Sequence, residues 1–486
     1  AKDRGIVIGY DARRGSREFS ELAASIFMGM GFKVHFFERE VPTPTAAYAV
    51  AKLKAAAGVM VTASHNPPDY NGYKVYWENG AQIIPPHDSG IHARIVEVGD
   101  IRELELIPLE AGKTLGHLRM LGAEMEQDYI KGVLAMRLHP DVKGRDELGI
   151  AYTPLHGVGG RFIKDVLERA GYSNFHIEPS QAEPDGRFPT VAFPNPEEPG
   201  AMDLAMELGK KKGADLIIAN DPDTDRLAAG LPDGDGYRML SGDQVGVLLA
   251  DYLLREGPEG HRLVATTIVS SQLLGVMAGS MGVDFEQTLT GFKWIANTAI
   301  AKKAETGARL VMGYEEALGY TIGELVRDKD GVSATLLFCE LAAHAAAQGS
   351  SVHKRLEDIY RRHGLYVTRQ VSLTMPGSEG LKTIAGKMKA LRANPPAEVA
   401  GFKVAEYDDL DDVADDLPRA DVLVFRLEGG ARVLVRPSGT EPKLKSYYEI
   451  REPMQEGEDL GAAMERAEAK LGALADGHQA QLAALG

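Results

Sequence analysis

The stretch GVMVTASHNPP, residues 58–68, begins as an apolar run typical of a buried strand and then stops abruptly. It ends in Ser64, His65 and Asn66, which two prolines follow. Serine, asparagine and proline are ordinary turn residues, so a purely structural turn is one interpretation. The other is that Ser64 is a nucleophile held at the end of a strand, and the rest of the chain decides between them.

Around this stretch, the first 65 residues alternate between strand-like and helix-like patterns. The predicted strands are 5–11, 33–38 and 58–64, and the predicted helices are 16–31 and 45–56. This βαβαβ order is typical of an open, mostly parallel sheet. Ligands of such sheets gather outside the carboxyl ends of the strands, and Ser64 lies at such an end.

The same rhythm restarts twice further along the chain, whereas the last part contains strands that read as antiparallel. The pattern predicts three similar α/β domains with mixed sheets, followed by a C-terminal α+β domain. The expected domains are residues 1–147, 148–257, 258–366 and 367–486. The acidic run 407–418 is expected to be a solvated loop or the start of a helix, and it receives no role.

Composition narrows the class of protein. At 486 residues the chain is too long for one hydrophobic core, and its net charge of −16 argues against a broad nucleic-acid surface. An anionic ligand would therefore need a local cluster of positive charge inside a cleft. No apolar stretch reaches the roughly 18 residues of a membrane span. A secretory signal is not expected, because the sequence given does not open with a charged region followed by an apolar one. The single cysteine, Cys339, is expected in the core. One cysteine cannot form a disulfide within the chain, which fits the reducing environment of the cytoplasm.

The motif NDPDTDR follows the apolar strand ADLIIA directly. Asp221, Asp223 and Asp225 alternate along what is expected to be an extended loop, so three carboxylates can converge on one point. Such hard oxygen ligands suit Mg²⁺ or Ca²⁺, and the spacing excludes an EF-hand. Arg226 beside them fits an anion that completes the coordination of the metal. The alternative is a polar turn after a buried strand.

Two further loops carry candidate binding residues. The motif VRPSGTEPK (435–443) has the ingredients of a phosphate cradle, although it also fits an exposed hairpin turn; these ingredients are Arg436, Ser438, Gly439 and Thr440. In GYEEALGY (313–320), Glu315 and Glu316 could accept hydrogen bonds from sugar hydroxyls or cap a following helix. Lys293, at another predicted strand end, is either a ligand contact or a surface lysine.

Four motifs together resemble the α-D-phosphohexomutase superfamily. TASHNP, DPDTDR, GYEEALGY and RPSGTEP occur in the order of that family, one in each predicted domain. The segments NGYK, YTPLHGVGG, TGFKWI and RDKDGV look most like the branch that contains phosphoglucomutase-2-like proteins, phosphopentomutases and bacterial phosphoglucomutase/phosphomannomutase proteins. The resemblance covers essentially the whole chain and implies an active site in a central cleft.

The resemblance also implies roles for single residues. Ser64 would carry the phosphoryl group, and Asp221, Asp223, Asp225 and a phosphoserine oxygen would hold one Mg²⁺ per chain. In the same way, Arg226 would steady the phosphoserine, Lys74 would serve as general base and acid, and His65 would have a secondary polar role. On the substrate side, Glu315 would hold ring hydroxyls and Lys293 would orient the sugar. The phosphate that does not react would be gripped by Arg436, Ser438, Gly439 and Thr440.

The implied activity is a mutase that interconverts hexose 1-phosphate and hexose 6-phosphate through a phosphoserine and a bisphosphorylated sugar, with a sugar bisphosphate as activator. Glucose phosphates are expected as substrates, with mannose phosphates as a further candidate. Alternatives are a phosphopentomutase, a sugar-1,6-bisphosphate synthase and a catalytically silent regulatory homologue. The protein is expected to bind no nucleic acid and no membrane, and to be a monomer or homodimer.

Two departures from the family pattern stand out. Many family members have a serine at the position of Ala317, two residues after the first glutamate of the sugar loop, and Leu318 follows here as an extra residue. The family also usually opens with an FGTxGxR segment, whereas this chain begins at Ala1 just before the first predicted strand. That segment is expected to be missing from the sequence given.

Overall fold

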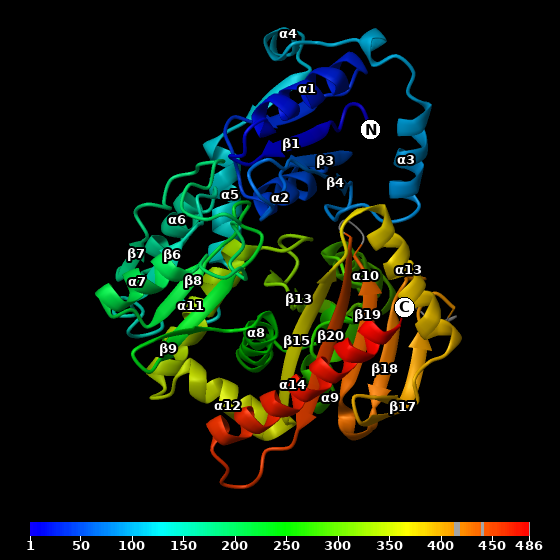
Figure 1. Cartoon of the computed structure of the whole chain (residues 1–486). Coiled ribbons are helices and arrows are strands. Elements are labelled where there is room, and N and C mark those ends of the chain that lie inside the picture. The colour runs from blue at the N-terminus through cyan, green and yellow to red at the C-terminus, as the bar shows by residue number, and fades with distance from the viewer. Residues whose placement is uncertain (413–417, 439–441, 486) are drawn as a thin grey trace. The chain divides into compact units, whose positions relative to one another are not determined.

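The computed structural model describes residues 1–412, 418–438 and 442–485 (Figure 1). These residues divide into two compact units. The first unit comprises Ala1–Ala265, Val283–Glu286 and Gly291–His353, and the second comprises Thr266–Gly282, Gln287–Thr290 and Lys354–Gly486. The predicted four-part division by residue number stays a prediction.

The first sheet is mixed and has the strand order β4-β3-β1-β2-β5. Its strands are β1 (Ile6–Tyr10), β2 (Val34–Phe37), β3 (Ala57–Val61), β4 (Tyr73–Trp77) and β5 (Leu118–Leu121). All pairs are parallel except β3 with β4. Every residue of β1 is buried, as expected for a parallel strand covered by helices on both faces. The helices of this region are α1 (Ser16–Gly29), α2 (Thr43–Leu53), α3 (His87–Glu97), η1 (Ile101–Glu103), α4 (Leu109–Thr114) and α5 (Ala123–Leu134).

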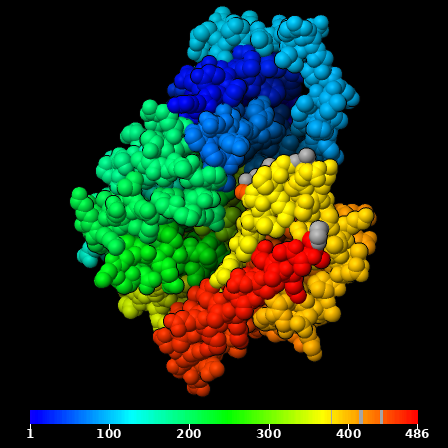
Figure 2. All heavy atoms as spheres, viewed as in Figure 1, coloured from blue at the N-terminus to red at the C-terminus, as the bar shows by residue number. Residues whose placement is uncertain are grey.

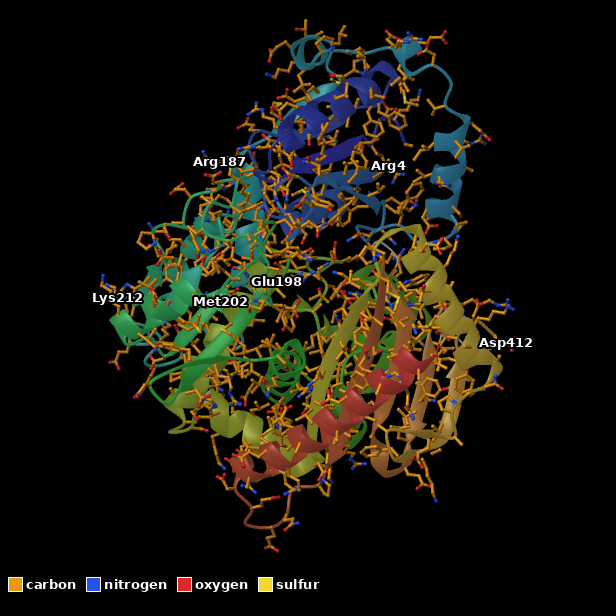
Figure 3. The ribbon with its side chains drawn as sticks, viewed as in Figure 1. Arg4, Arg187, Glu198, Met202, Lys212 and Asp412 are labelled. Atoms are coloured by element: carbon orange, nitrogen blue, oxygen red, sulfur yellow. The ribbon has the colours of Figure 1, made fainter. Side chains whose placement is uncertain are left out.

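The second sheet repeats this plan with the order β10-β9-β8-β6-β7. Its strands are β6 (Ile150–Thr153), β7 (Phe175–Ile177), β8 (Leu216–Ala219), β9 (Ala228–Asp233) and β10 (Gly236–Met239). Here β6, β7 and β8 are parallel, and β9 returns antiparallel to β8. The accompanying helices are α6 (Gly160–Ala170), α7 (Asp203–Lys212) and α8 (Gly242–Glu256). Met202 immediately before α7 and Lys212 at its end are marked in Figure 3.

The third sheet has the order β12-β11-β13-β14. Its strands are β11 (Arg262–Thr267), β12 (Asp284–Thr288), β13 (Arg309–Glu315) and β14 (Gly319–Ile322). Its helices are α9 (Leu273–Ser280), α10 (Phe292–Thr306) and α11 (Gly331–Ala347), and α12 (Val352–His363) follows. Helix α11 is buried along most of its length, and Cys339 lies in it with no exposed surface, so the predicted core position of this cysteine is confirmed.

The second unit contains a six-stranded sheet with the order β15-β20-β19-β18-β17-β16, in which every pair is antiparallel. Its elements are β15 (Leu365–Thr374), α13 (Gly377–Ala393), β16 (Glu398–Val399), β17 (Phe402–Asp409), β18 (Leu423–Leu427), η2 (Glu428–Gly430), β19 (Arg432–Pro437), β20 (Lys443–Glu452) and α14 (Leu460–Ala484). Helix α14 runs along β15 and β20, and its outer face is at the surface in Figure 2. The predicted α+β character of this part is confirmed.

One prediction about this unit is wrong in part. The acidic run 407–418 was expected to be a loop or a helix start, but Tyr407–Asp409 is the end of strand β17 and pairs with β18. Alternate side chains of an edge-side strand face solvent, so acidic residues are compatible with a strand here. Residues 413–417 of the run lie outside the described residues.

The three mixed sheets share one local arrangement: a motif singled out in the sequence joins a strand to its antiparallel neighbour. Ser64 lies between β3 and β4, the aspartates lie between β8 and β9, and Ala317 lies between β13 and β14. The helix cap considered for GYEEALGY is therefore wrong, because a hairpin strand follows the glutamates. Each connection contains a non-glycine residue with a left-handed φ, at Ser64 (50°), Thr224 (60°) and Leu318 (64°). Such strained residues cluster at functional sites.

Candidate active site

Ser64 lies three residues beyond the end of β3, where the chain leaves the sheet. Its backbone N–H donates to Oγ1 of Thr62 at 2.8 Å, which helps to hold the left-handed turn. Its Oγ donates to Oδ2 of Asp221 at 2.8 Å, and Nδ1 of His65 lies 3.2 Å from the same Oγ. Burial, with a further contribution from Arg226, lowers the pKa of His65 to about 2, so this imidazole is neutral. The structure thus places the predicted nucleophile against the predicted metal ligands.

A buried arginine that sequence reasoning missed holds the backbone of this turn. The guanidinium of Arg13 donates to the carbonyl oxygens of Ser64 (2.5 Å), Asn66 (2.5 Å) and Pro67 (2.8 Å). Asp11 lies 3.3 Å from Nε of Arg13 and also accepts a hydrogen bond from Thr62. A planar fork with several N–H groups can satisfy several carbonyls at once. In the sequence, the only sign of this role is that Arg13 follows the first predicted strand closely.

The three aspartates of DPDTDR converge as predicted, but in a compact turn instead of an extended loop. Thr224 N–H donates to the carbonyl oxygen of Asp221 across the turn at 2.8 Å. Asp221, Asp223 and Asp225 have no exposed surface, and one carboxylate oxygen from each lies within 4.8 Å of the others. Three buried carboxylates so close together need positive charge, because burying an unpaired ion is costly.

The donor set of this cluster fits a hard divalent cation. Oδ1 of Asp223 and Oδ1 of Asp225 are buried and make no hydrogen bond to the residues that the structure describes. Buried carboxylate oxygens without donors are suited to metal coordination, and an all-oxygen set is what Mg²⁺ and Ca²⁺ prefer. Burial and the two neighbouring carboxylates raise the pKa of Asp221 well above its usual range. Burial acts in the same direction on Asp223, but Lys74 outweighs it and lowers the pKa of Asp223.

Two lysines supply positive charge beside the aspartates. Nζ of Lys74, from β4, donates to Oδ2 of Asp223 at 2.7 Å and to Oδ2 of Asp225 at 2.9 Å. Burial favours the neutral amine, yet the carboxylates raise the pKa of Lys74 well above its usual value, so it is charged. Lys329, in RDKDGV, lies 3.2 Å from Oδ2 of Asp225. Sequence reasoning noted RDKDGV as part of the resemblance but gave Lys329 no role.

Arg226 follows the aspartates directly and borders the same cluster. Its Nε lies 3.9 Å from Oδ2 of Asp221, and its Nη1 donates to Glu197 at 3.4 Å. The loop that carries Glu197 is marked in Figure 3 by the adjacent Glu198. The guanidinium therefore lies close to the carboxylate that accepts a hydrogen bond from the hydroxyl of Ser64, and its predicted role in steadying a phosphoserine stays a prediction.

The hairpin of the sugar motif lies against the aspartate turn. Arg226 forms an isolated antiparallel bridge with Gly319, and the N–H of Leu227 donates to the carbonyl oxygen of Leu318 at 3.0 Å. Oε1 of Glu315 accepts a hydrogen bond from the N–H of Gly291 at 2.7 Å, and burial raises the pKa of its carboxyl. The structure thus brings the predicted sugar residue next to the predicted metal ligands.

Gly291, whose N–H donates to Glu315, immediately precedes helix α10, and Lys293 is the second residue of that helix. Lys293, in the first turn of α10, is part-buried, and its Nζ lies 5.5 Å from the centre of the Trp294 ring. Glu316, part-buried in the hairpin connection, follows Glu315. The predicted sugar contacts of Lys293 and Glu316 stay predictions.

The phosphate motif belongs to the second unit and joins β19 to β20. Arg436 pairs with Lys445 in the ladder, and the N–H of Ser438 donates to the carbonyl oxygen of Lys443 at 2.8 Å. The two interpretations of this motif, a hairpin turn and a phosphate-binding loop, are compatible, because the backbone N–H groups of a turn between two strands can bind an anion. Gly439 and Thr440 lie outside the described residues. The central cleft implied by the resemblance stays a prediction.

Comparison with known proteins gives matches along most of the chain. Four phosphoglucomutase/phosphomannomutase family models match in order: α/β/α domain I at residues 1–101, domain II at 127–234, domain III at 241–363 and the C-terminal domain at 386–467. Among curated relatives, a probable phosphomannomutase of Haemophilus influenzae is 41% identical over 93% of this chain and 89% of its own length. A probable phosphoribomutase of Schizosaccharomyces pombe is 38% identical over 91% of this chain and 78% of its own length.

Solved structures agree with these matches. The crystal structure of a putative phosphomannomutase from Thermus thermophilus matches with a TM-score of 0.70 and 25% identity, and it covers 96% of this chain and 90% of that one. Among the described residues, none of the helices is both long and apolar enough to span a bilayer.

Proposed function

The chain belongs to the phosphoglucomutase/phosphomannomutase family, and on that premise we propose that it interconverts hexose 1-phosphate and hexose 6-phosphate. The predicted resemblance, the fold class and the enzyme class are confirmed: the chain is a phosphosugar mutase, an isomerase that transfers a phosphoryl group within its substrate. The proposal concerns the sugar and the residues that act on it.

One observation carries the proposal: the Ser64 hydroxyl donates directly into the cluster of three aspartates, at 2.8 Å from Asp221. In our proposal Ser64 bears the phosphoryl group. The bond from its Oγ to phosphorus breaks as the sugar oxygen forms a bond to the same phosphorus. Charged Lys74 protonates the departing Oγ and regains a proton from the sugar hydroxyl. Lys74 can give its proton first because the neighbouring carboxylates raise its pKa and keep it charged before the reaction.

We propose that Asp221, Asp223, Asp225 and the phosphoserine hold one Mg²⁺ per chain. Bound there, Mg²⁺ would offset the charge of the transferring phosphoryl group. Arg226 faces Asp221 and adds a second positive charge at the same place. His65 is kept neutral by burial, and we propose that it contributes a polar contact to Ser64 without adding charge. A sugar bisphosphate is proposed as the activator that phosphorylates Ser64, and a cytoplasmic location is proposed from the free, buried Cys339.

The choice of sugar rests on the hairpin between β13 and β14. Glu315 offers acceptor oxygens suited to adjacent ring hydroxyls, with Glu316 and Lys293 as further contacts. Ala317 lacks the hydroxyl that many family members have there, so discrimination between sugars should be loose. One neutral hydrogen bond contributes about 0.5–1.5 kcal/mol, or roughly a two- to twelvefold preference. Arg436, Ser438, Gly439 and Thr440 are proposed to grip the distal phosphate in every substrate.

A pentose phosphate is the second candidate. The S. pombe relative named a probable phosphoribomutase is nearly as similar to this chain as the H. influenzae relative named a probable phosphomannomutase. The same serine, aspartates and phosphate hairpin would serve a pentose 1-phosphate, because the roles proposed for them concern phosphoryl groups, which both kinds of sugar phosphate carry.

Specificity constants for glucose, mannose and ribose 1-phosphates, each assayed with its bisphosphate, test the proposal. We expect glucose to be preferred over mannose by about tenfold or less. A ribose preference of about a hundredfold or more, equivalent to about 2.7 kcal/mol, would replace the hexose by the pentose assignment. Absence of turnover with all three sugars would contradict both.

A further inference from the structure

Two histidines and a glutamate converge in the first unit, outside the active site. His139 follows α5, Glu256 ends α8, and His344 lies in the last turn of α11. Nε2 of His139 lies 3.2 Å from Oε2 of Glu256, and Nε2 of His344 lies 4.0 Å from the same oxygen. The two imidazoles stack with ring centres 4.1 Å apart and planes 9° from parallel. One ligand atom from each residue lies within 4.8 Å of the others.

A buried hydrogen-bond network supports these three side chains. Glu340, only 1% exposed, accepts hydrogen bonds from Tyr252 Oη and from the N–H of Leu138, both at 2.8 Å. These three residues each precede one member of the cluster: Glu340 is four residues before His344, Tyr252 is four residues before Glu256, and Leu138 is adjacent to His139. Residues four apart share one face of a helix. The network therefore fixes the backbone from which each side chain of the cluster extends.

The donor set suits a borderline divalent ion. Two imidazole nitrogens and one carboxylate oxygen are a common set for Zn²⁺, whereas Mg²⁺ prefers oxygen alone. Bonds of about 2.0–2.1 Å in a tetrahedron place ligand atoms about 3.3–3.5 Å apart. The observed separations of 3.2 and 4.0 Å from Glu256 bracket this value, but the two imidazole planes are only 9° from parallel, so one ring has to turn about its Cβ–Cγ bond before both nitrogens point at one ion. We propose that His139, Glu256 and His344 form a binding site for a single zinc-type divalent ion, separate from the aspartate cluster.

The fourth ligand is the side chain of Gln348 or a water molecule. Nε2 of Gln348 lies 3.1 Å from Nε2 of His344, so this amide is at the same edge of the imidazole. Rotation of the amide group by half a turn would present its carbonyl oxygen to the ion, since the two ends of a glutamine amide have the same shape. The site would then join α8, α11 and the segment after α5.

The site and the aspartates lie toward opposite ends of α11. The N–H of Gly331, the first residue of α11, donates to the carbonyl oxygen of Thr224 in the aspartate turn at 3.2 Å. His344 is 13 residues further along, which is roughly 20 Å at 1.5 Å per residue. An ion there would act on the stability of the first unit and would not touch the substrate.

Isothermal titration of metal-stripped protein with Zn²⁺, in excess Mg²⁺ at near-neutral pH, tests this site. We expect one Zn²⁺ per chain with micromolar affinity, and a rise in the midpoint of thermal unfolding. His139→Ala should weaken this binding by more than about tenfold, since loss of a direct ligand exceeds the usual effect of an outer partner. The His139 side chain is 35% exposed, so this variant should fold. His344→Ala and Glu256→Gln should show the same loss.

His261→Ala is the matched control. Its imidazole pairs with Asp284 at 2.7 Å but belongs to no group of three ligating side chains among the residues that the structure describes, so the variant should bind Zn²⁺ like the parent protein. Asp223→Asn should also bind Zn²⁺ at the histidine site like the parent protein. Co²⁺ bound at the histidine site should show the visible absorption of a four-coordinate ion. The proposal is wrong if no Zn²⁺ binds with a dissociation constant below about 10⁻⁴ M. It is equally wrong if His139→Ala retains full binding while Asp223→Asn loses it.

Discussion

The Ser64 turn and the aspartate turn solve the same structural problem in different ways. Both leave a buried parallel strand, both return as an antiparallel neighbour, and both contain a left-handed residue that is not glycine. Ser64 and His65 are nevertheless part-exposed, whereas Asp221, Asp223 and Asp225 have no exposed surface. The proposed function accounts for this difference, because a nucleophile has to meet its substrate, while a charged cluster that holds a cation works best away from water.

The two turns also differ in what stabilises them. The Ser64 turn is held through its backbone carbonyl oxygens by one buried arginine, Arg13. The aspartate turn is held through its side chains by the cations of Lys74 and Lys329. The comparison teaches that the first turn depends on hydrogen-bond geometry and the second on charge. Three substitutions test this difference and a fourth tests the ion network that joins the two scaffolds, in order from the largest expected effect to the smallest.

Ser64→Ala should reduce mutase turnover by more than about 10³-fold, because no other group replaces a lost covalent nucleophile. The fold should persist, since alanine tolerates the left-handed φ of 50° about as well as serine does. Turnover and the intact mass of the purified protein are the measurements. The parent protein should carry a fraction with one added phosphate that the variant lacks, and near-parental turnover in Ser64→Ala would contradict the mechanism.

Asp223→Asn should lower kcat by about 10²–10³-fold and raise the Mg²⁺ concentration needed for half-maximal rate. The physical reason is loss of one carboxylate from the cluster and of its ion pair with Lys74, which measures 2.7 Å. Asp233→Asn is the matched control, because Asp233 is exposed at the end of β9 in the same sheet. Rate against Mg²⁺ concentration is the measurement, and activity that survives exhaustive chelation would show that the cluster is no metal site.

Arg13→Lys should lower kcat by about 10–100-fold through small displacement of Ser64. A lysine ammonium cannot reach the carbonyl oxygens of Ser64, Asn66 and Pro67 together, as the guanidinium does. The Mg²⁺ dependence should stay unchanged, because the aspartate turn does not rely on Arg13 in this way. Arg14→Lys, at the exposed neighbouring position, is the control. An equal loss in both variants would argue against a positioning role for Arg13.

Glu126→Gln should have the smallest effect and should act on stability alone. Glu126, 3% exposed, accepts hydrogen bonds from Arg39 (2.9 Å) after β2 and from Arg161 (3.0 Å) in α6, so it joins the scaffolds of the two turns. Both arginines are partly exposed, and we expect a loss of about 1–2 kcal/mol in the free energy of unfolding at neutral pH. Urea unfolding measures it, with the exposed Glu124→Gln as control.

The pH dependence of this loss has a definite sign. Burial would raise the pKa of Glu126, but the hydrogen bonds from Arg161 and Arg39 outweigh it and lower the pKa below its usual value. The ion network therefore contributes stability above the unfolded-state pKa, and that stability is lost as the pH falls through the lowered folded-state value. The difference between parent and Glu126→Gln should shrink in acid. A difference that grows in acid would contradict this account.

Much of the fold was readable from local patterns. The strands around Ser64 and Asp221 were predicted because a short apolar run followed by turn residues specifies a buried strand and its end. The hairpin at Glu315 was read less well, because the same glutamates also fit a helix start and only the pairing of β13 with β14 decided between them. The acidic run at 407–409 misled for a similar reason, since charge alone does not distinguish a strand with one face toward solvent from a loop.

The sequence by itself determined the family, the order of the motifs and the chemical types of the candidate site residues: a serine, three carboxylates and the polar residues of the RPSGTEP motif. Only the tertiary structure decided which cations meet those carboxylates and what holds the serine. Lys74 contacts Asp223 across 149 residues of chain, and Arg13 contacts Ser64 across 51. Contacts at such separations depend on how strands and helices pack, and local residue preferences carry no information about them.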